Sequence, residues 1–323
     1  MIILMFSESC EKSDQGRLPE IFTNVGFGVT PTSAICSGRI ITSNLDSTIS
    51  EWGVCWSTGH LPVITDNKVS SVTEMPWVWL TITGLSQQTG YYVRAYATIS
   101  TGTAYGEELS FTTPADHTGE TGTVGDADGN VYQTIGIGGQ IWMTENLKTT
   151  RYSNGDLIET TTPATLDIYA EVAPKYQWAY DGDESNVATY GRFYTWDAVT
   201  DTRNVCPAAW HVPSNIEWKT LELFLGDENV AGGKLKETGT TYWTTPNTGA
   251  TNETGFSALP GGFRRGDGIF DYIGDWGAWW SSTPFFNYVG KVFLYYDSSS
   301  DRLEIEPASF NNGFSVRCLR DDD

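Results

Sequence analysis

The sequence predicts two domains, an all-β sandwich followed by an α+β domain. The chain has 323 residues, which is more than one small sandwich needs and enough for two domains. Short apolar runs alternate with clusters of Gly, Asn, Asp and Ser, a pattern typical of many strands joined by turns. Helix signals are few and lie in the second half, which favours an α+β fold there.

Composition and charge restrict the partners. With 19 Lys and Arg against 40 Asp and Glu, the formal net charge is -21. A field of this sign repels phosphate backbones and anionic lipid headgroups, so we expect no nucleic-acid partner. An acidic surface suits solubility outside a cell, or the capture of cations and neutral polymers such as glycans. Plain solubility is the simpler interpretation.

Cysteine usage indicates an oxidising compartment. None of the five cysteines forms a Cys-x-x-Cys pair, and only three histidines could assist them, so we expect no zinc site. Four cysteines fall in the two predicted domains, two in each, and one lies near the start: Cys36, Cys55, Cys206, Cys318 and Cys10. This count fits two disulfides and one further cysteine that has a different role.

Residues 1–20 are interpreted as a lipoprotein signal remnant and a tether. The apolar run at residues 1–6 is too short to span a bilayer. Ser9 precedes Cys10, and polar residues follow. The junction resembles the Ser-Cys-Glu-Lys sequence of Bacteroidetes lipoproteins, although Ser7 stands where an apolar residue is usual. The resemblance implies a lipid on Cys10 and a place on the outer membrane, facing outward; the alternative is a free cysteine in a tail.

Residues 21–114 have the pattern of an antiparallel β-sandwich. Short strand-like runs recur with turn residues between them, at 34–40, 52–56, 77–82, 91–97 and 108–113. Trp77 and Trp79 have period-two spacing, which is more typical of one packed face, in the core or against another domain, than of a binding stripe.

This segment resembles the fibronectin type III family. Gly84-Leu85 is followed by the tyrosine-rich run 89–97, and the runs 34–38 and 53–58 look like the cysteine-bearing variant of Bacteroidetes surface proteins. The resemblance implies a Cys36–Cys55 bridge between the second and third strands. It also implies a spacer or presentation stalk.

Residues 115–125 lack apolar periodicity and are interpreted as a linker before a second domain at 126–323. In that domain, residues 131–143 form a predicted hairpin around a glycine turn. The preceding Asp126-Ala127-Asp128-Gly129-Asn130 has some features of a calcium loop. The glutamate and flanking helices of an EF-hand are missing, which favours a turn and no cofactor, with calcium as the alternative.

One helix is clearly predicted. Ser214 and Glu217 have the spacing of a capping box, and Gly226 ends the run. Between them, apolar side chains recur at helical spacing: Trp218, Leu221 and Leu225. A shorter helix is expected near residues 233–237.

The second domain resembles the Fibrobacter succinogenes major paralogous (FISUMP) domain family. Five ordered motifs carry the resemblance, at residues 141–147, 206–213, 255–262, 279–282 and 313–318. A more distant similarity, to the C-type lectin and formylglycine-generating-enzyme superfamily, rests on residues 210–218 and 313–318. It implies paired terminal strands, a long loop region carrying the binding site, and a Cys206–Cys318 bridge worth roughly 4–5 kcal/mol.

Signals for catalysis are weak, and we expect no enzyme. Formylglycine-generating chemistry needs a cysteine that this domain does not have to spare. No carboxylate pair can be singled out among 40 acids, and no nucleophile elbow or His-Glu-x-x-His motif occurs. His211 is interpreted as packed beside Trp210 rather than acting as a base.

A better candidate is a binding loop at residues 264–277, where acids and aromatic residues alternate: Asp267, Asp271, Tyr272, Asp275 and Trp276. Aromatic faces stack on sugars, while carboxylates accept sugar hydroxyls or hold calcium. Packing over the domain fits Tyr272 and Trp276 equally well, whereas Trp279 and Trp280 are expected in the core. Residues 265–267 also form an Arg-Gly-Asp tripeptide, too common a sequence to indicate an integrin ligand.

The sequence therefore favours a surface lipoprotein that binds a glycan or a surface protein in adhesion. A structural module of a fimbrial or matrix assembly is the alternative. A formylglycine-enzyme-like catalyst is the third hypothesis.

Overall fold

The structure is a computed structural model that describes residues 18–41, 48–71, 77–285, 288–295 and 302–321. They fall into two compact units that meet in the sequence between Thr113 and Pro114. Within the described residues, no helix is long and apolar enough to cross a bilayer. The expected lipidation site, Cys10, lies outside the described residues.

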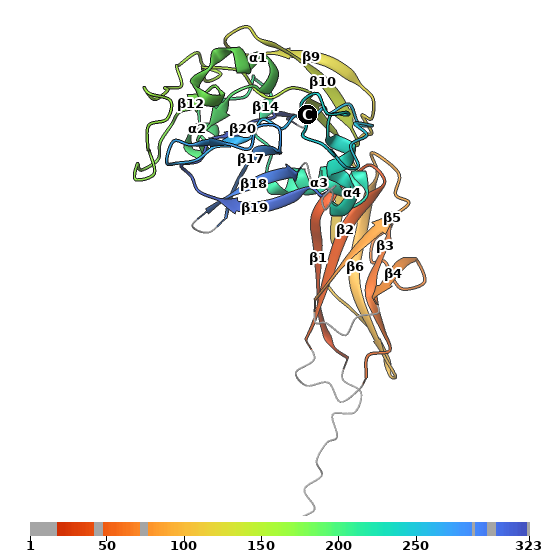
Figure 1. Ribbon diagram of the computed structural model, residues 1–323. Coiled ribbons are helices and arrows are strands. Elements are labelled where there is room, and N and C mark those ends of the chain that lie inside the picture. Colours follow the sequence, from red (N-terminus) through yellow and green to blue (C-terminus); the bar gives the residue numbers. More distant parts are fainter. Residues whose placement is uncertain (1–17, 42–47, 72–76, 286–287, 296–301, 322–323) are drawn as a thin grey trace, which may run out of the picture. The chain divides into compact units, whose positions relative to one another are not determined.

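The first unit is an antiparallel β-sandwich (Figure 1). One sheet has the order β1-β2-β5, and the other has the order β4-β3-β6-β7, with β8 also paired to β6. Their bounds are β1 Glu20–Val29, β2 Ser33–Ile41, β3 Glu51–Ser57, β4 Asn67–Ser71, β5 Trp77–Thr83, β6 Gly90–Ile99, β7 Gly102–Tyr105 and β8 Leu109–Thr112. The prediction of an all-β N-terminal region is confirmed.

The core of the sandwich lies between its two sheets. Ile21 and Ile40 of the first sheet pack with Trp52 and Ala97 of the second. Trp79 is not part of that core, because its side chain is 50% exposed, so the expectation of core packing is wrong for this residue, whereas packing against another domain stays a prediction. The period-two rule explains the difference, since it turns Leu80 and Ile82 of β5 toward the interior on alternate positions.

The predicted Cys36–Cys55 bridge is wrong, because both residues are buried free thiols. Cys36 on β2 faces the intersheet core with Val54 of β3. Cys55 is adjacent to Val54 on the strand, so it projects from the opposite face of its sheet. Its thiol there donates to the carbonyl oxygens of Pro62, at 3.4 Å, and Arg94, at 3.5 Å.

The second unit is α+β and contains two larger sheets (Figure 1). The five-stranded sheet has the order β14-β21-β11-β10-β9: Trp210–His211, Leu319–Arg320, Gln140–Met143, Val131–Ile137 and Thr121–Gly125. The six-stranded sheet has the order β12-β13-β20-β17-β18-β19: Gln177–Trp178, Phe193–Tyr194, Phe314–Ser315, Trp276–Phe285, Tyr288–Tyr295 and Glu304–Ala308. A separate two-stranded hairpin pairs β15 Phe263–Arg264 with β16 Phe270–Asp271.

Residues 115–125 are not the linker that the sequence predicted. Residues 121–125 form β9, which pairs antiparallel with β10. The preceding residues are also fixed, because the His117 and Gly119 amides donate to Gly138 and Gly136. An edge strand of this kind is held by backbone hydrogen bonds, so it needs no apolar alternation.

The helices gather between β14 and β15, apart from short turns earlier in the unit. Helix α3 spans Asn215–Leu225 and begins with the predicted capping box, in which the Ser214 hydroxyl accepts from the Glu217 amide. Helix α4 spans Glu228–Leu235 and so begins before the predicted position. The shorter helices are η1 Tyr180–Gly182, η2 Glu184–Asn186, α1 Val187–Tyr190 and α2 Trp196–Val199.

The core of the second unit is rich in tryptophan. Trp279 and Trp280 are buried as predicted. The Cys206–Cys318 disulfide is present and closes a loop across 112 positions of sequence. Cys318 immediately precedes β21, and Cys206 lies shortly before β14, so the disulfide ties together the ends of two paired strands of the five-stranded sheet.

Candidate ligand-binding site

An open pocket of about 410 Å³ lies over the β15–β16 hairpin. Aromatic and polar residues line it together with one glycine: Tyr169, Phe263, Arg265, Gly266, Asp267, Tyr272, Trp276, Ser309 and Asn312. The volume is within the range of small-molecule sites, roughly 300–1,000 Å³.

The hairpin forms because its loop satisfies its own backbone. The Arg265 amide donates to Ile269 at 2.8 Å, and the Gly268 amide donates back to Arg265 at 3.0 Å. Gly268 has a φ of +91°, and a Cβ there would lie 2.0 Å from the carbonyl oxygen of Thr165. Glycine is therefore required at this turn.

A second turn, after β16, places the two predicted aromatic residues together. Tyr272 has a φ of +63°, and its carbonyl accepts from the Asp275 and Trp276 amides, both at 3.0 Å. The chain thus reverses within four residues. The rings of Tyr272 and Trp276 stack 3.9 Å apart with planes 6° from parallel. The buried ring of Phe263 lies near both and nearly parallel to them.

Tyr169 comes from a distant segment that is tied to the hairpin. Arg264, which is fully buried, donates from its guanidinium to the carbonyls of Ala164 and Leu166. The Asn311 amide donates to the carbonyl of Ile168 at 2.6 Å and also to that of Tyr169. These bonds fix the backbone of Tyr169, while its side chain stays 71% exposed at the pocket.

The polar side of the pocket centres on Arg265. Its guanidinium pairs with Asp267 at 2.8 Å and lies 3.5 Å from Asp271. The Arg-Gly-Asp tripeptide is therefore closed by an internal ion pair. On the neighbouring segment, the Asn312 side chain accepts from the Gly266 amide at 3.1 Å and leaves its own amide group as a donor.

The structure brings three of the five predicted ligand-binding residues into one pocket. Asp267, Tyr272 and Trp276 line it, and Asp271, which is not a lining residue, pairs with the lining residue Arg265. Asp275 is not among the lining residues. Sequence reasoning missed Tyr169, Ser309 and Asn312, which carry no local motif and reach the site only through the fold.

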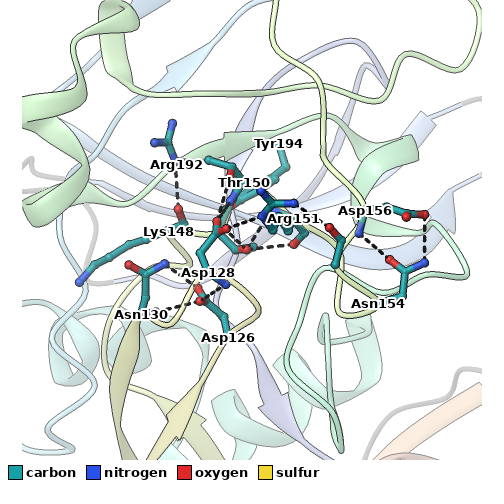
Figure 2. A network of polar contacts seen from close by, with 12 residues as sticks. Asp126, Asp128, Asn130, Lys148, Thr150, Arg151, Asn154, Asp156, Arg192 and Tyr194 are labelled. Carbon is teal, nitrogen blue, oxygen red and sulfur yellow. Dashed lines mark hydrogen bonds and ion pairs between the residues drawn. The ribbon is translucent and has the colours of Figure 1, made fainter.

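The Asp126–Asn130 loop is a turn whose carboxylates are engaged by protein donors (Figure 2). Asp126 accepts from the Asn130 amide at 2.9 Å and from the Tyr132 hydroxyl at 2.5 Å. Asp128 accepts from the Thr150 amide at 2.6 Å and pairs with Arg151 at 3.0 Å. The described residues hold no group of three or more metal-ligating side chains suited to an ion.

His211 lies between two carboxylates. Its ring nitrogens contact Glu217 at 2.7 Å and Asp321 at 2.6 Å. The hydrogen bond with Glu217, followed by that with Asp321, raises the pKa of His211 to about 9 although burial opposes the shift. A cationic imidazole therefore links β14 to the start of α3, which is a bonding role that the sequence did not indicate.

The pocket belongs to the part of the chain that a known family describes. Residues 135–320 match the Fibrobacter succinogenes major domain, and this is more than half of the chain. The chain is therefore a member of that family, as the ordered motifs predicted. No curated protein matches it.

Likenesses to solved structures are weak. The sensor domain of the anti-sigma factor RsgI4 of Pseudobacteroides cellulosolvens is 20% identical, with 30% of this chain and 95% of that chain covered and a TM-score of 0.23. The third fibronectin III domain of human KIAA0343 is 14% identical, with 34% and 94% covered and a TM-score of 0.23. Scores this low carry no conclusion about fold or function.

Proposed function

We propose that the pocket over the β15–β16 hairpin binds a glycan, and that the protein is a binding or adhesion protein rather than an enzyme. The observation that carries the proposal is the pairing of exposed aromatic rings with a polar rim in one pocket. Tyr169 and Tyr272 are 71% and 43% exposed, although exposed aromatic side chains are costly to leave in water.

The chemistry of the rim fits sugar hydroxyls. Asp267 offers hydrogen-bond acceptors and Arg265 offers donors, and the ion pair between them already fixes their positions. Asn312 adds an amide donor. Neutral sugars also suit an acidic chain, because they bring no negative charge to it. Among the described lining residues, Asp267 is the single carboxylate, whereas glycoside hydrolysis needs two.

A glycan array, probed with and without calcium, tests the proposal. We expect binding to neutral glycans that does not require calcium. Tyr272→Ala should weaken the binding of the best ligand by about 2 kcal/mol, or roughly thirtyfold in Kd, because the substitution removes a stacking surface. Tyr242→Ala is the matched control, because Tyr242 is similarly exposed, at 40%, and lies outside this pocket.

Two results would contradict this function. One is an array without binding; the other is a Tyr272→Ala variant that binds as tightly as the parent. Capture of a protein ligand by the same residues would favour the alternative of a structural module in a surface or fimbrial assembly.

The fold family of each unit and the cellular location of the protein are also proposals. We infer a fibronectin III-like stalk and a C-type-lectin-like second domain, the latter because the last strand of the unit pairs with an early one, β11. The Ser9-Cys10 junction supports lipidation and display on the outer membrane. Metabolic labelling with an alkyne fatty acid tests this, and Cys10→Ser should abolish the label.

A further inference from the structure

A second pocket in the same unit, of about 330 Å³, shares no lining residue with the first. Arg317, Asn146 and Ser257 line it, together with Glu145, Glu237 and Tyr242. Its volume lies near the lower end of the range of small-molecule sites. None of these residues takes part in the proposed glycan site.

Arg317 is a buried cation with unused donors. Its side chain is 1% exposed and comes from the segment between β20 and Cys318. The terminal nitrogens donate to the carbonyl of Phe256 and, at 2.8 Å, to the side-chain oxygen of Asn146. The third nitrogen, Nε, has no partner. Within the described residues, no carboxylate forms an ion pair with it.

The other fully buried arginine shows what a structural arginine looks like in this fold. All three guanidinium nitrogens of Arg264 donate to carbonyl oxygens: those of Ala164, Arg265 and Leu166. Leaving a buried charged donor unpaired costs more than pairing it, so a purely structural Arg317 would be satisfied in the same way. Arg317, which lines a pocket, instead leaves its buried Nε donor unpaired.

Asn146 holds the guanidinium in place without neutralising it. The Asn146 oxygen accepts from Arg317 and also from the Trp279 ring nitrogen at 2.8 Å. Its amide nitrogen donates to the carbonyl of Tyr190 at 2.9 Å, which fixes the orientation of the side chain. The guanidinium also lies over the ring of Phe256, 4.2 Å from its centroid. The charge is therefore oriented, and Glu145, whose negative charge acts on it, does not come close enough to form an ion pair with it.

The same pocket carries two acids that are only partly buried. Glu145 pairs with Lys148, and Glu237 accepts from the Asn252 side chain at 2.9 Å. Neither acid forms an ion pair with Arg317. A buried positive charge and two more accessible negative charges thus share one small pocket. A ligand that complements it carries a carboxylate at one end and an ammonium group at the other.

We propose that this pocket binds a free amino acid, with its carboxylate on Arg317 and its ammonium group toward Glu145 and Glu237. A carboxylate accepts charge-assisted N–H bonds from a guanidinium, and each terminal nitrogen of Arg317 has two hydrogens, of which the structure shows one in use. Burial lowers the pKa of Arg317 to about 9, and a bound carboxylate would raise it again.

Isothermal titration of the full chain with each of the twenty standard L-amino acids is the first test. We expect saturable binding of at least one. The tightest is then compared with its analogue without the amine and its analogue without the carboxylate. Each analogue should bind at least about tenfold more weakly, because each loses one charged contact. No binding by any amino acid, or equal binding by either analogue, overturns the proposal.

Variants test the residues. Arg317→Lys keeps the charge but loses the planar fork, so we expect at least about a tenfold weaker Kd. Because this buried substitution can unfold the domain, Glu237→Gln is the second variant, with an expected loss of about threefold or more. Asp267→Asn, in the other pocket, is the control and should bind the amino acid normally. Unchanged binding by Glu237→Gln overturns the proposal.

The two binding proposals can be tested, and contradicted, independently of each other. Tyr242 lines the Arg317 pocket, and Tyr272 lines the glycan pocket. Tyr242→Ala should therefore weaken amino-acid binding and spare glycan binding, and Tyr272→Ala should do the reverse. Loss of both ligands in one variant indicates unfolding, which the near-ultraviolet circular dichroism of each variant detects.

Discussion

Tyr272 and Trp276 stack face to face, with ring centroids 3.9 Å apart, and they do so because the backbone of Tyr272 is left-handed. A positive φ is costly for a bulky residue, by about 1–2 kcal/mol. A hydrogen bond from a neighbouring segment stabilises the turn that contains Tyr272, because the Gly262 amide donates to the Trp276 carbonyl at 2.8 Å. The two stacked rings that line the pocket therefore depend on a strained backbone conformation. Hydrogen bonds from neighbouring segments compensate for the cost of that strain.

Gly262→Ala should disturb this wall. A Cβ at Gly262 would lie 2.2 Å from the Asp271 carbonyl oxygen, and the residue has a φ of +67°. We expect a loss of roughly 3 kcal/mol in the free energy of unfolding, measured by urea titration, because the backbone itself must move. The matched control is Gly239→Ala. It has a φ of +75° but open space around it, so it should cost only about 1 kcal/mol. Equal losses in the two variants would show that the contact with Asp271 is unimportant.

Asp128→Ala should destabilise the second unit at neutral pH. Burial alone would raise the pKa of Asp128, but hydrogen bonds from the Thr150 amide and hydroxyl, and the charge of Arg151, hold it below its usual value. A depressed pKa stabilises the fold above the unfolded value near 3.8 and stops doing so as the pH falls through the folded value. The variant should therefore lose about 2 kcal/mol at pH 7, and the difference should shrink below pH 4.

Urea titrations of parent and variant from pH 7 to pH 3 measure this difference. Thr150→Val removes the hydroxyl donor and keeps the amide, so its loss should be smaller than that of Asp128→Ala. A pH-independent difference would mean that the Asp128 charge contributes nothing.

Local sequence signals predicted the local parts of the structure. The Ser214–Glu217 capping box predicted the start of α3, since its two partners are three positions apart. That Asp267, Tyr272 and Trp276 line one pocket was predictable for the same reason, because one short loop carries all three. Tyr169 and Asn312 lie far from that loop in the sequence, and only the bonds of Arg264 and Asn311 bring their segments beside it. No spacing rule contains that information.

The Cys36–Cys55 error has a different origin. The alternation of Trp52, Val54 and Trp56 along β3 already indicated that Cys55 faces away from the core. The family resemblance suggested the bridge instead. The placement of the two cysteines on the second and third strands was predicted correctly, whereas side-chain direction, which decides whether a disulfide can form, was not.

Thiol counting should find two buried, unreactive cysteines. Burial raises the pKa of Cys36 to about 12 and that of Cys55 to about 11, so little thiolate exists at pH 8. In a Cys10→Ser variant, Ellman's reagent should therefore react slowly with the native protein and with two thiols after unfolding in guanidinium. Intact mass under the same conditions should show one disulfide. A count of zero thiols would restore the Cys36–Cys55 bridge.

His211 should make the stability of the second unit fall in alkaline solution. Its pKa is raised from 6.5 in the unfolded chain to about 9 in the fold, chiefly by the hydrogen bond with Glu217. A raised pKa stabilises the fold fully below 6.5, and this contribution is lost as the pH rises through about 9. The unfolding free energy of the parent should therefore approach that of His211→Gln between pH 6.5 and 9. Because the imidazole is partly exposed, solvent screening reduces the size of the effect. Nuclear magnetic resonance titration of the ring gives the pKa directly. Asp321→Asn removes the second partner and leaves the capping box intact, so it should lower that pKa while α3 stays folded. An imidazole that titrates near 6.5 in the native protein would show that the two carboxylates do not hold it.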